Sequence, residues 1–63
     1  MEDVKYLKPE ELEIDKVYET YVKDLVSVKK VDHEKESVTL YNITGSFSQM
    51  TLFRDLRITR KIR

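Results

Sequence analysis

The sequence contains no cysteine, so it can form neither a disulfide nor a thiolate metal site. This absence matters in a chain of 63 residues, because a domain of that size buries only about 60% of the surface that its unfolded chain exposes. A partner protein or a second copy would therefore be a credible source of extra stability. We expect one small domain that covers residues 1–63.

The chain has one glycine, one proline and no alanine. A single glycine excludes a glycine-rich loop that cradles phosphate groups. The absence of alanine, the best helix former, disfavours long helices. In contrast, sixteen residues are β-branched and four are tyrosines, and both kinds of residue favour strands. The composition therefore predicts an all-β protein.

Long hydrophobic runs are also missing. No segment approaches the roughly 20 apolar residues that span a bilayer, and the first six residues have neither the basic region nor the apolar region of a secretory signal. We expect no membrane partner and a cytoplasmic location. A small, cysteine-free chain of this kind is compatible with a bacterial or phage accessory protein.

The formal net charge is zero, but the two signs are separated along the chain. Residues 1–19 carry seven acids and three lysines, whereas residues 53–63 carry five bases and one acid. Opposite net charges at the two ends predict that the ends attract each other in the fold.

Short segments of alternating polarity predict five strands. We place them at 16–22, 25–31, 37–44, 47–53 and 57–62, with one helical turn that begins at Pro9 and a tight, 3-10-like turn at 54–56. Residues 32–36 should form the turn of a hairpin. Lys29 and Lys30 interrupt the apolar alternation, which indicates a β-bulge that returns Val31 to the core. Gly45 is expected to supply a positive φ in the next turn.

The alternation also assigns faces. Val38 and Leu40 should point inward, and Tyr41 and Ile43 outward. Leu7 and Leu12 should flank the first turn and close the core. In the last strand the expected inward residues are Leu56, Ile58 and Ile62, and the expected outward residues are Arg57, Thr59, Lys61 and Arg63.

The order of these elements is similar to that of the SH3-like small barrels: an L-x-P-x-x-L turn, an apolar and tyrosine-containing strand, a hairpin, and a one-turn helix before the last strand. The resemblance implies a five-stranded SH3-like barrel over most of the chain. The aromatic and acidic cluster of peptide-binding SH3 domains is missing, as is a KOW-type signature with its central glycine. The resemblance therefore concerns fold and implies no activity.

The sequence offers little to a catalytic or metal site. The one histidine, His33, lies in an acidic segment, 32–36, but glycine and glutamate are missing from the positions where a calcium-binding loop needs them. The four serines are scattered, and His33 is the one imidazole that could activate them. We expect no enzyme activity, no cofactor, no metal and no small-molecule substrate.

Two functions remain. The favoured hypothesis is a non-enzymatic protein-binding module, which binds a protein partner or a second copy of itself. Tyr18 and Tyr21 point to opposite sides of their strand, so one of them should join Tyr41 and Ile43 in an exposed patch. The alternative for that patch is that the N-terminal segment folds over it and completes the core.

The second hypothesis is a nucleic-acid-binding small barrel. Its contacts would come from the basic C-terminal segment, namely Arg54, Arg57, Arg60, Lys61 and Arg63. The alternative is that these charges protect an edge strand from pairing with other chains. Contact between the acidic N-terminal segment and these bases would weaken the nucleic-acid hypothesis.

Overall fold

A computed structural model describes residues 5–63 of the chain. The predicted all-β class is confirmed: the described residues form one five-stranded antiparallel sheet with two short 3-10 turns. The strands are β1 (Val17–Thr20), β2 (Leu25–Asp32), β3 (Ser37–Asn42), β4 (Phe47–Leu52) and β5 (Ile58–Lys61), and the turns are η1 (Pro9–Glu11) and η2 (Phe53–Asp55). No helix among these residues is long and apolar enough to cross a membrane.

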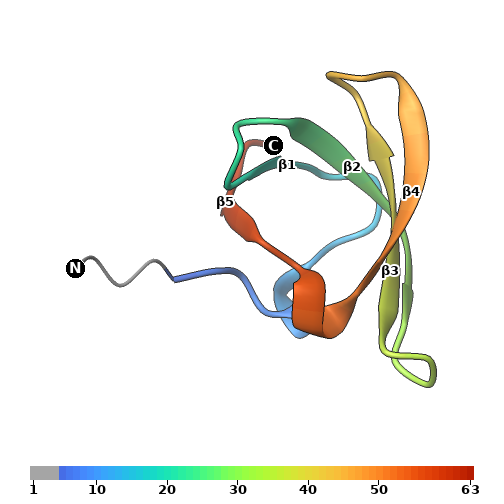
Figure 1. Cartoon of the computed structure of the whole chain (residues 1–63). Helices are drawn as coiled ribbons and strands as arrows, with labels where there is room; N and C mark the ends of the chain where they lie inside the picture. The colour runs from blue at the N-terminus through green and yellow to red at the C-terminus, as the bar shows by residue number, and fades with distance from the viewer. Residues whose placement is uncertain (1–4) are drawn as a thin grey trace.

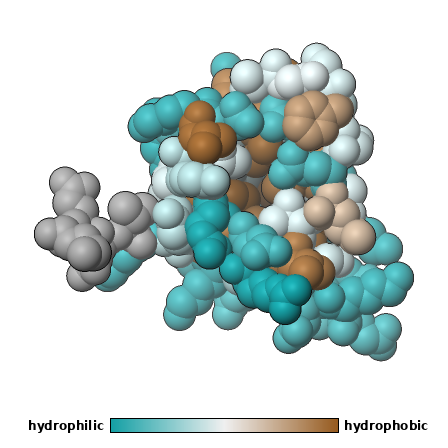
Figure 2. Space-filling model, viewed as in Figure 1, coloured by the Kyte–Doolittle hydropathy of each residue, from teal (hydrophilic) through white to brown (hydrophobic). Residues whose placement is uncertain are grey.

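The strand order is β4-β3-β2-β1-β5, and Figure 1 shows that the sheet bends strongly, with β4 and β5 at its two ends. The predicted closure into a barrel is not seen, since β4 and β5 do not pair in the described structure. One reason is that the main-chain amide of Leu7 donates a hydrogen bond of 2.8 Å to the carbonyl of Ile58, so the N-terminal segment occupies part of the outer edge of β5. Figure 2 shows hydrophobic atoms recessed among polar ones at the centre of this open side.

The β2–β3 hairpin is confirmed together with its bulge. The register shifts between Val28 and Lys30, so Lys29 has no partner on β3. The extra residue turns both Val28 and Val31 toward the interior, where Val31 packs against the core. Asp32 closes the hairpin turn, because its Oδ1 accepts hydrogen bonds from the amides of Glu34 and Lys35 at 3.0 and 3.1 Å.

The core lies on the concave face of the bent sheet. Its buried hydrophobic residues are Leu12, Tyr18, Val26, Val28, Val38, Leu40, Leu56 and Ile58, and Leu7 packs against them. The predicted inward positions of Val38 and Leu40 and the role of Leu7 and Leu12 are therefore confirmed. The phenol of Tyr18 is also satisfied, since its oxygen accepts a hydrogen bond of 2.9 Å from the amide of Glu13.

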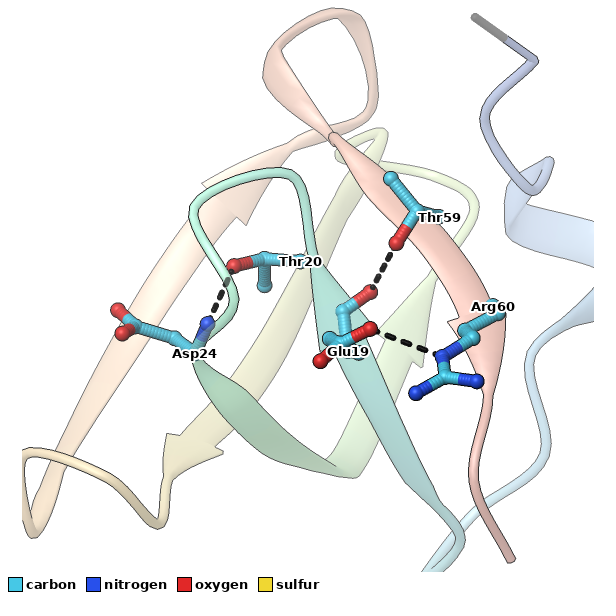
Figure 3. Close-up of polar contacts among 5 residues, drawn as sticks. All are labelled: Glu19, Thr20, Asp24, Thr59 and Arg60. Atoms are coloured by element: carbon cyan, nitrogen blue, oxygen red, sulfur yellow. Dashed lines mark hydrogen bonds and ion pairs between the residues drawn. The ribbon is translucent and has the colours of Figure 1, made fainter.

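A second bulge lies between β1 and β5. Thr20 pairs with Ile58 and Glu19 with Arg60, which leaves Thr59 unpaired in register. Figure 3 shows the side-chain hydrogen bonds at this bulge. The Thr59 hydroxyl donates to the Glu19 carbonyl at 3.1 Å, and Arg60 Nε donates to the Glu19 carboxylate at 2.8 Å.

This bulge corrects the predicted faces at the end of β5. Because one extra residue exchanges the two faces of a strand, Lys61 lies opposite Tyr18 and shares the face of that core residue. The predicted inward position of Ile62 is wrong. It lies beyond the end of β5 and is 38% exposed.

The turn between β3 and β4 also differs from the prediction. Gly45 does not have a positive φ, and Ser46 takes that conformation instead, with φ of 58°. The amide of Gly45 donates to Asn42 Oδ1 at 2.8 Å, and Asn42 Nδ2 donates to Asp24 Oδ2 at 3.1 Å. Asn42 thereby connects the β3–β4 turn to the β1–β2 turn.

Candidate functional site

The β3–β4 hairpin is the uncharged part of this protein. Residues 37–53 contain no Asp, Glu, Lys or Arg, although these residues make up 38% of the chain. The segment includes β3 and the edge strand β4. A neutral, partly apolar hairpin at the end of a sheet is therefore set in an otherwise highly charged molecule.

Three apolar side chains of this hairpin share the convex face. Tyr41 lies opposite Ser48, and Thr39 lies opposite Met50, so Tyr41 and Met50 point to the face opposite Leu40. Ile43 follows Tyr41 at the strand period. Met50 is 71% exposed and Ile43 is 41% exposed, whereas Tyr41 is half-buried. We call Tyr41, Ile43 and Met50 the hairpin patch.

Phe47 is a further exposed apolar residue at the tip of the hairpin, but it pairs with Asn42 and therefore lies on the face opposite the hairpin patch. Its side chain is 48% exposed, and its ring lies over Gly45, where a Cβ atom would come within 2.8 Å of Phe47 Cδ1. A larger residue at position 45 would therefore displace the ring of Phe47 from this position.

The outer edge of β4 has no neighbouring strand. The amide of Phe53 donates to the carbonyl of Glu36 at 2.7 Å, so the main-chain groups of Phe53 point toward the β3 side. Along an antiparallel strand the main-chain groups of successive residues point to alternate sides. Those of Ser48, Met50 and Leu52 therefore point away from β3, to the outer edge. They form an open row of donors and acceptors along an uncharged strand.

The other edge of the sheet is protected in two ways. β5 carries the charged residues Arg60 and Lys61, and the amide of Leu7 hydrogen-bonds to Ile58 on its outer side. Charge and a covering segment both prevent an edge strand from pairing with other chains. The two edges therefore differ in kind, and the β4 edge has neither protection in the described part of the chain.

Exposed apolar residues also occur elsewhere. They are Ile14, Ile62 and the consecutive residues Tyr21 and Val22 of the β1–β2 turn. Ile14 lies between Glu13 and Asp15, and Ile62 between two basic residues. Single exposed apolar side chains such as these two are common on protein surfaces, and Tyr21 and Val22 lie in a turn that is followed directly by the charged residues Lys23 and Asp24.

A hollow of about 120 Å³ lies between β4 and β5 on the open side of the sheet. Its walls include Gln49 and Thr51 from β4 and Leu56, Arg57 and Ile58 from the other side. Pockets that enclose small molecules usually measure about 300–1,000 Å³. A larger depression of about 600 Å³ runs along the N-terminal segment, where its lining includes Tyr6, Leu7 and Thr59.

The four predicted protein-binding residues do not come together. One of Tyr18 and Tyr21 was expected to face outward, and Tyr18 is the buried one, so it cannot belong to an exposed patch. Tyr21 is 60% exposed, but it lies in the turn after β1 and lines the hollow. Only Tyr41 and Ile43 share a surface, and both belong to the hairpin patch.

Two predicted nucleic-acid-binding residues are held by acids of the N-terminal segment and β1. Lys61 Nζ lies 2.9 Å from Glu13 Oε2, and Arg60 Nε lies 2.8 Å from Glu19 Oε1. The predicted attraction between the two ends of the chain is therefore seen in the structure.

The side chain of Arg57 also has contacts within the chain. Its guanidinium stacks over the ring of Tyr6 with a distance of 5.4 Å to the centroid, and its Nη1 donates to the carbonyls of Arg54 and Leu56. Arg54 and Arg63 make no ion pair among the described residues. The basic segment therefore presents fewer unengaged charges than its sequence indicates.

The Glu13–Lys61 contact affects both titrations. The hydrogen bond from Lys61 lowers the pKa of Glu13 below its usual value of 4.5, and the same bond raises the pKa of Lys61 above 10.5. The amide of Lys35 is the main cause of a lowered pKa for Asp32, with a further contribution from the amide of Glu34. All three groups are at the surface, and their shifts follow from hydrogen bonds within the fold.

His33 lies in the β2–β3 turn, and its ring makes an edge contact with Phe53 at a centroid distance of 5.5 Å. No side-chain hydrogen bond joins it to a serine in the described structure. Within residues 5–63, no group of three or more His, Cys, Asp or Glu residues is placed to hold a metal ion.

Sequence reasoning missed Phe47 and Met50. Both lie in a segment whose alternation predicts a strand, but alternation alone does not reveal that this strand is at an edge of the sheet. The signal that could have found them is the absence of charge over residues 37–53.

Comparisons of this chain with protein-family models, with curated proteins and with solved structures find no match.

Proposed function

We propose that this protein is a non-enzymatic protein-interaction module that binds through the uncharged β3–β4 hairpin. The observation that carries the proposal is that residues 37–53 lack charge and end in an open strand edge beside the hairpin patch. Interface centres are depleted of charged residues and enriched in aromatic residues and methionine. The hairpin patch has this composition.

The charge distribution supports the same proposal over nucleic-acid binding. A surface that follows phosphates needs basic side chains that are free to neutralise them and so displace the counterions of the nucleic acid, and here Arg60 and Lys61 contact acids of the same chain. Nucleic-acid-binding domains are usually basic as a whole, whereas this chain has a net charge of zero.

The proposal includes the expected fold and location. We regard the molecule as an SH3-like barrel that remains open between β4 and β5, in which the open side leaves the hairpin available to a partner. No enzyme activity and no cofactor are part of this function, and the location is cytoplasmic.

The test compares two single substitutions of similarly exposed residues. Ile43→Ser should weaken capture of a partner, or of a labelled copy of the chain, by about tenfold, because it removes an apolar contact at the interface. Val22→Ser, in the β1–β2 turn, should leave capture unchanged. Affinity pull-down from host lysate with each immobilised variant measures the difference, and circular dichroism checks that both variants fold.

Capture that is equally strong with both variants would contradict the proposal, as would a wild-type chain that binds nothing. Fluorescence anisotropy with DNA and RNA at low salt provides a further control. Salt-dependent binding that disappears when Arg57, Lys61 and Arg63 are changed to Glu would favour the nucleic-acid alternative.

A further inference from the structure

We propose that β4 pairs with β4 of a second copy of this chain, antiparallel and around a two-fold axis, so that two open sheets join into one. This inference rests on the proposed function and names its partner. It concerns the main-chain edge of β4, whereas the proposed function rests on the side chains of the hairpin.

The backbone geometry selects one register. The main-chain groups of Ser48, Met50 and Leu52 project from the open edge, as the Phe53–Glu36 hydrogen bond requires for an alternating ladder. A two-fold axis at Met50 places Met50 opposite its own copy and Ser48 opposite Leu52 of the second copy. In this register all three projecting residues form hydrogen-bonded pairs.

The side chains fit the same arrangement. Around a two-fold axis each residue near the centre meets itself or a close neighbour, so a charged strand would place like charges against each other. β4 and the residues on either side of it carry no charge. Met50, at 71% exposure, would gain an apolar neighbour that it lacks in the single chain.

The composition of the whole chain favours a second copy over a different partner. The net charge is zero, so two copies do not repel each other at long range. The hairpin offers no charge that would attract a partner of opposite sign. A core of eight buried hydrophobic residues is small. Association with a second copy would bury additional apolar surface.

The assembly also ends at two copies. Pairing of the β4 edges leaves only the two β5 edges at the ends of the joined sheet. Each β5 edge is blocked by Arg60, Lys61 and the Leu7 segment. The contact is therefore closed, and open-ended growth of strands is prevented.

Sedimentation at several concentrations of the full chain tests the pairing. Met50→Lys places two lysines against each other at the axis and should raise the dissociation constant of the dimer by at least about tenfold. Tyr21→Lys adds the same charge at a residue of similar exposure outside β4. It should leave the dissociation constant unchanged.

Single cysteines test the register, since the chain has none of its own. Met50→Cys should form a disulfide-linked dimer on mild oxidation, because opposed residues lie about 5.5 Å apart between Cα atoms and a disulfide needs about 4.4–6.8 Å. Ser48→Cys is the matched control. Its Cα would lie about 14 Å from the same atom of the second copy, which is on the neighbouring strand and four residues further along it, and it should cross-link far less.

A chain that stays monomeric at every concentration overturns this inference, and so does cross-linking that is equal for Met50→Cys and Ser48→Cys. If such a monomer still captures another protein and loses it on Ile43→Ser, the two-fold pairing fails while the proposed function stands. If wild type dimerises, Met50→Lys does not, and Met50→Cys cross-links much more than Ser48→Cys, the inference is supported.

Discussion

At the scale of single residues, Tyr18 and Tyr21 show how one strand separates a structural tyrosine from an exposed one. Tyr18 is buried and accepts a hydrogen bond from the amide of Glu13, while Tyr21 is 60% exposed in the following turn. Their opposite orientation follows from the strand period and could be predicted. Which of them faces the core could not, because that depends on the neighbouring strands.

Substitution of the two hydroxyls measures this difference. Tyr18→Phe should lower the free energy of unfolding by about 1 kcal/mol, because it removes one hydrogen bond and leaves the ring in the core. Tyr21→Phe should change it by less than about 0.5 kcal/mol. Urea denaturation of both variants gives the comparison, and equal losses would show that the assigned environments are wrong.

The β3–β4 turn is a residue-scale feature that sequence reasoning assigned incorrectly. Glycine is the residue that takes positive φ most easily, so Gly45 was the natural choice. In the structure the ring of Phe47 occupies the space where a Cβ of residue 45 would lie, and Ser46 takes the positive φ. A contact between side chain and backbone is not visible in the sequence pattern.

At the scale of elements, the two bulges differ in how well the sequence indicates them. Val28 and Val31 are three positions apart with two lysines between them, so both can face the core only if a residue is inserted. Ile58 and Ile62 are four positions apart and keep a regular alternation. Thr59 is compatible with either face, and the bulge there becomes apparent only from the pairing with β1.

The contact between the segment before β1 and the end of β5 predicts a pH dependence. Glu13 has a lowered pKa, so its stabilising effect is present above its unfolded value of 4.5 and is lost as the pH falls through the folded value. Lys61 has a raised pKa, so its effect is present below 10.5 and is lost as the pH rises through the folded value. Between these limits the pair contributes a constant amount.

Thermal denaturation between neutral and acidic pH checks this prediction. Glu13→Gln should reduce the loss of stability below pH 4.5, since the lowered pKa of that carboxyl group no longer contributes. Glu10→Gln changes the net charge equally at a residue without an ion pair in the described structure and serves as the control. The same acid dependence in both variants would contradict the assigned role of the contact.

At the scale of the whole molecule, charge is distributed unevenly over the sheet. The acidic and basic ends meet across β1 and β5, as their opposite net charges predicted. The charged side chains at the β5 end of the sheet are thereby paired within the chain, and the uncharged hairpin lies at the other end. The expected closure of the sheet was not seen, because it depends on whether β4 or the Leu7 segment lies along β5, and the strand pattern alone does not distinguish the two.

The central claim is that this protein associates with a second copy of itself through the open edge of β4. The most direct measurement follows the backbone amide signals of the labelled wild-type chain by nuclear magnetic resonance through a dilution series. We predict that the signals of Ser48, Met50 and Leu52 shift with concentration while those of β5 stay constant. Signals in β4 that do not change, or changes confined to residues 57–63, would contradict the claim.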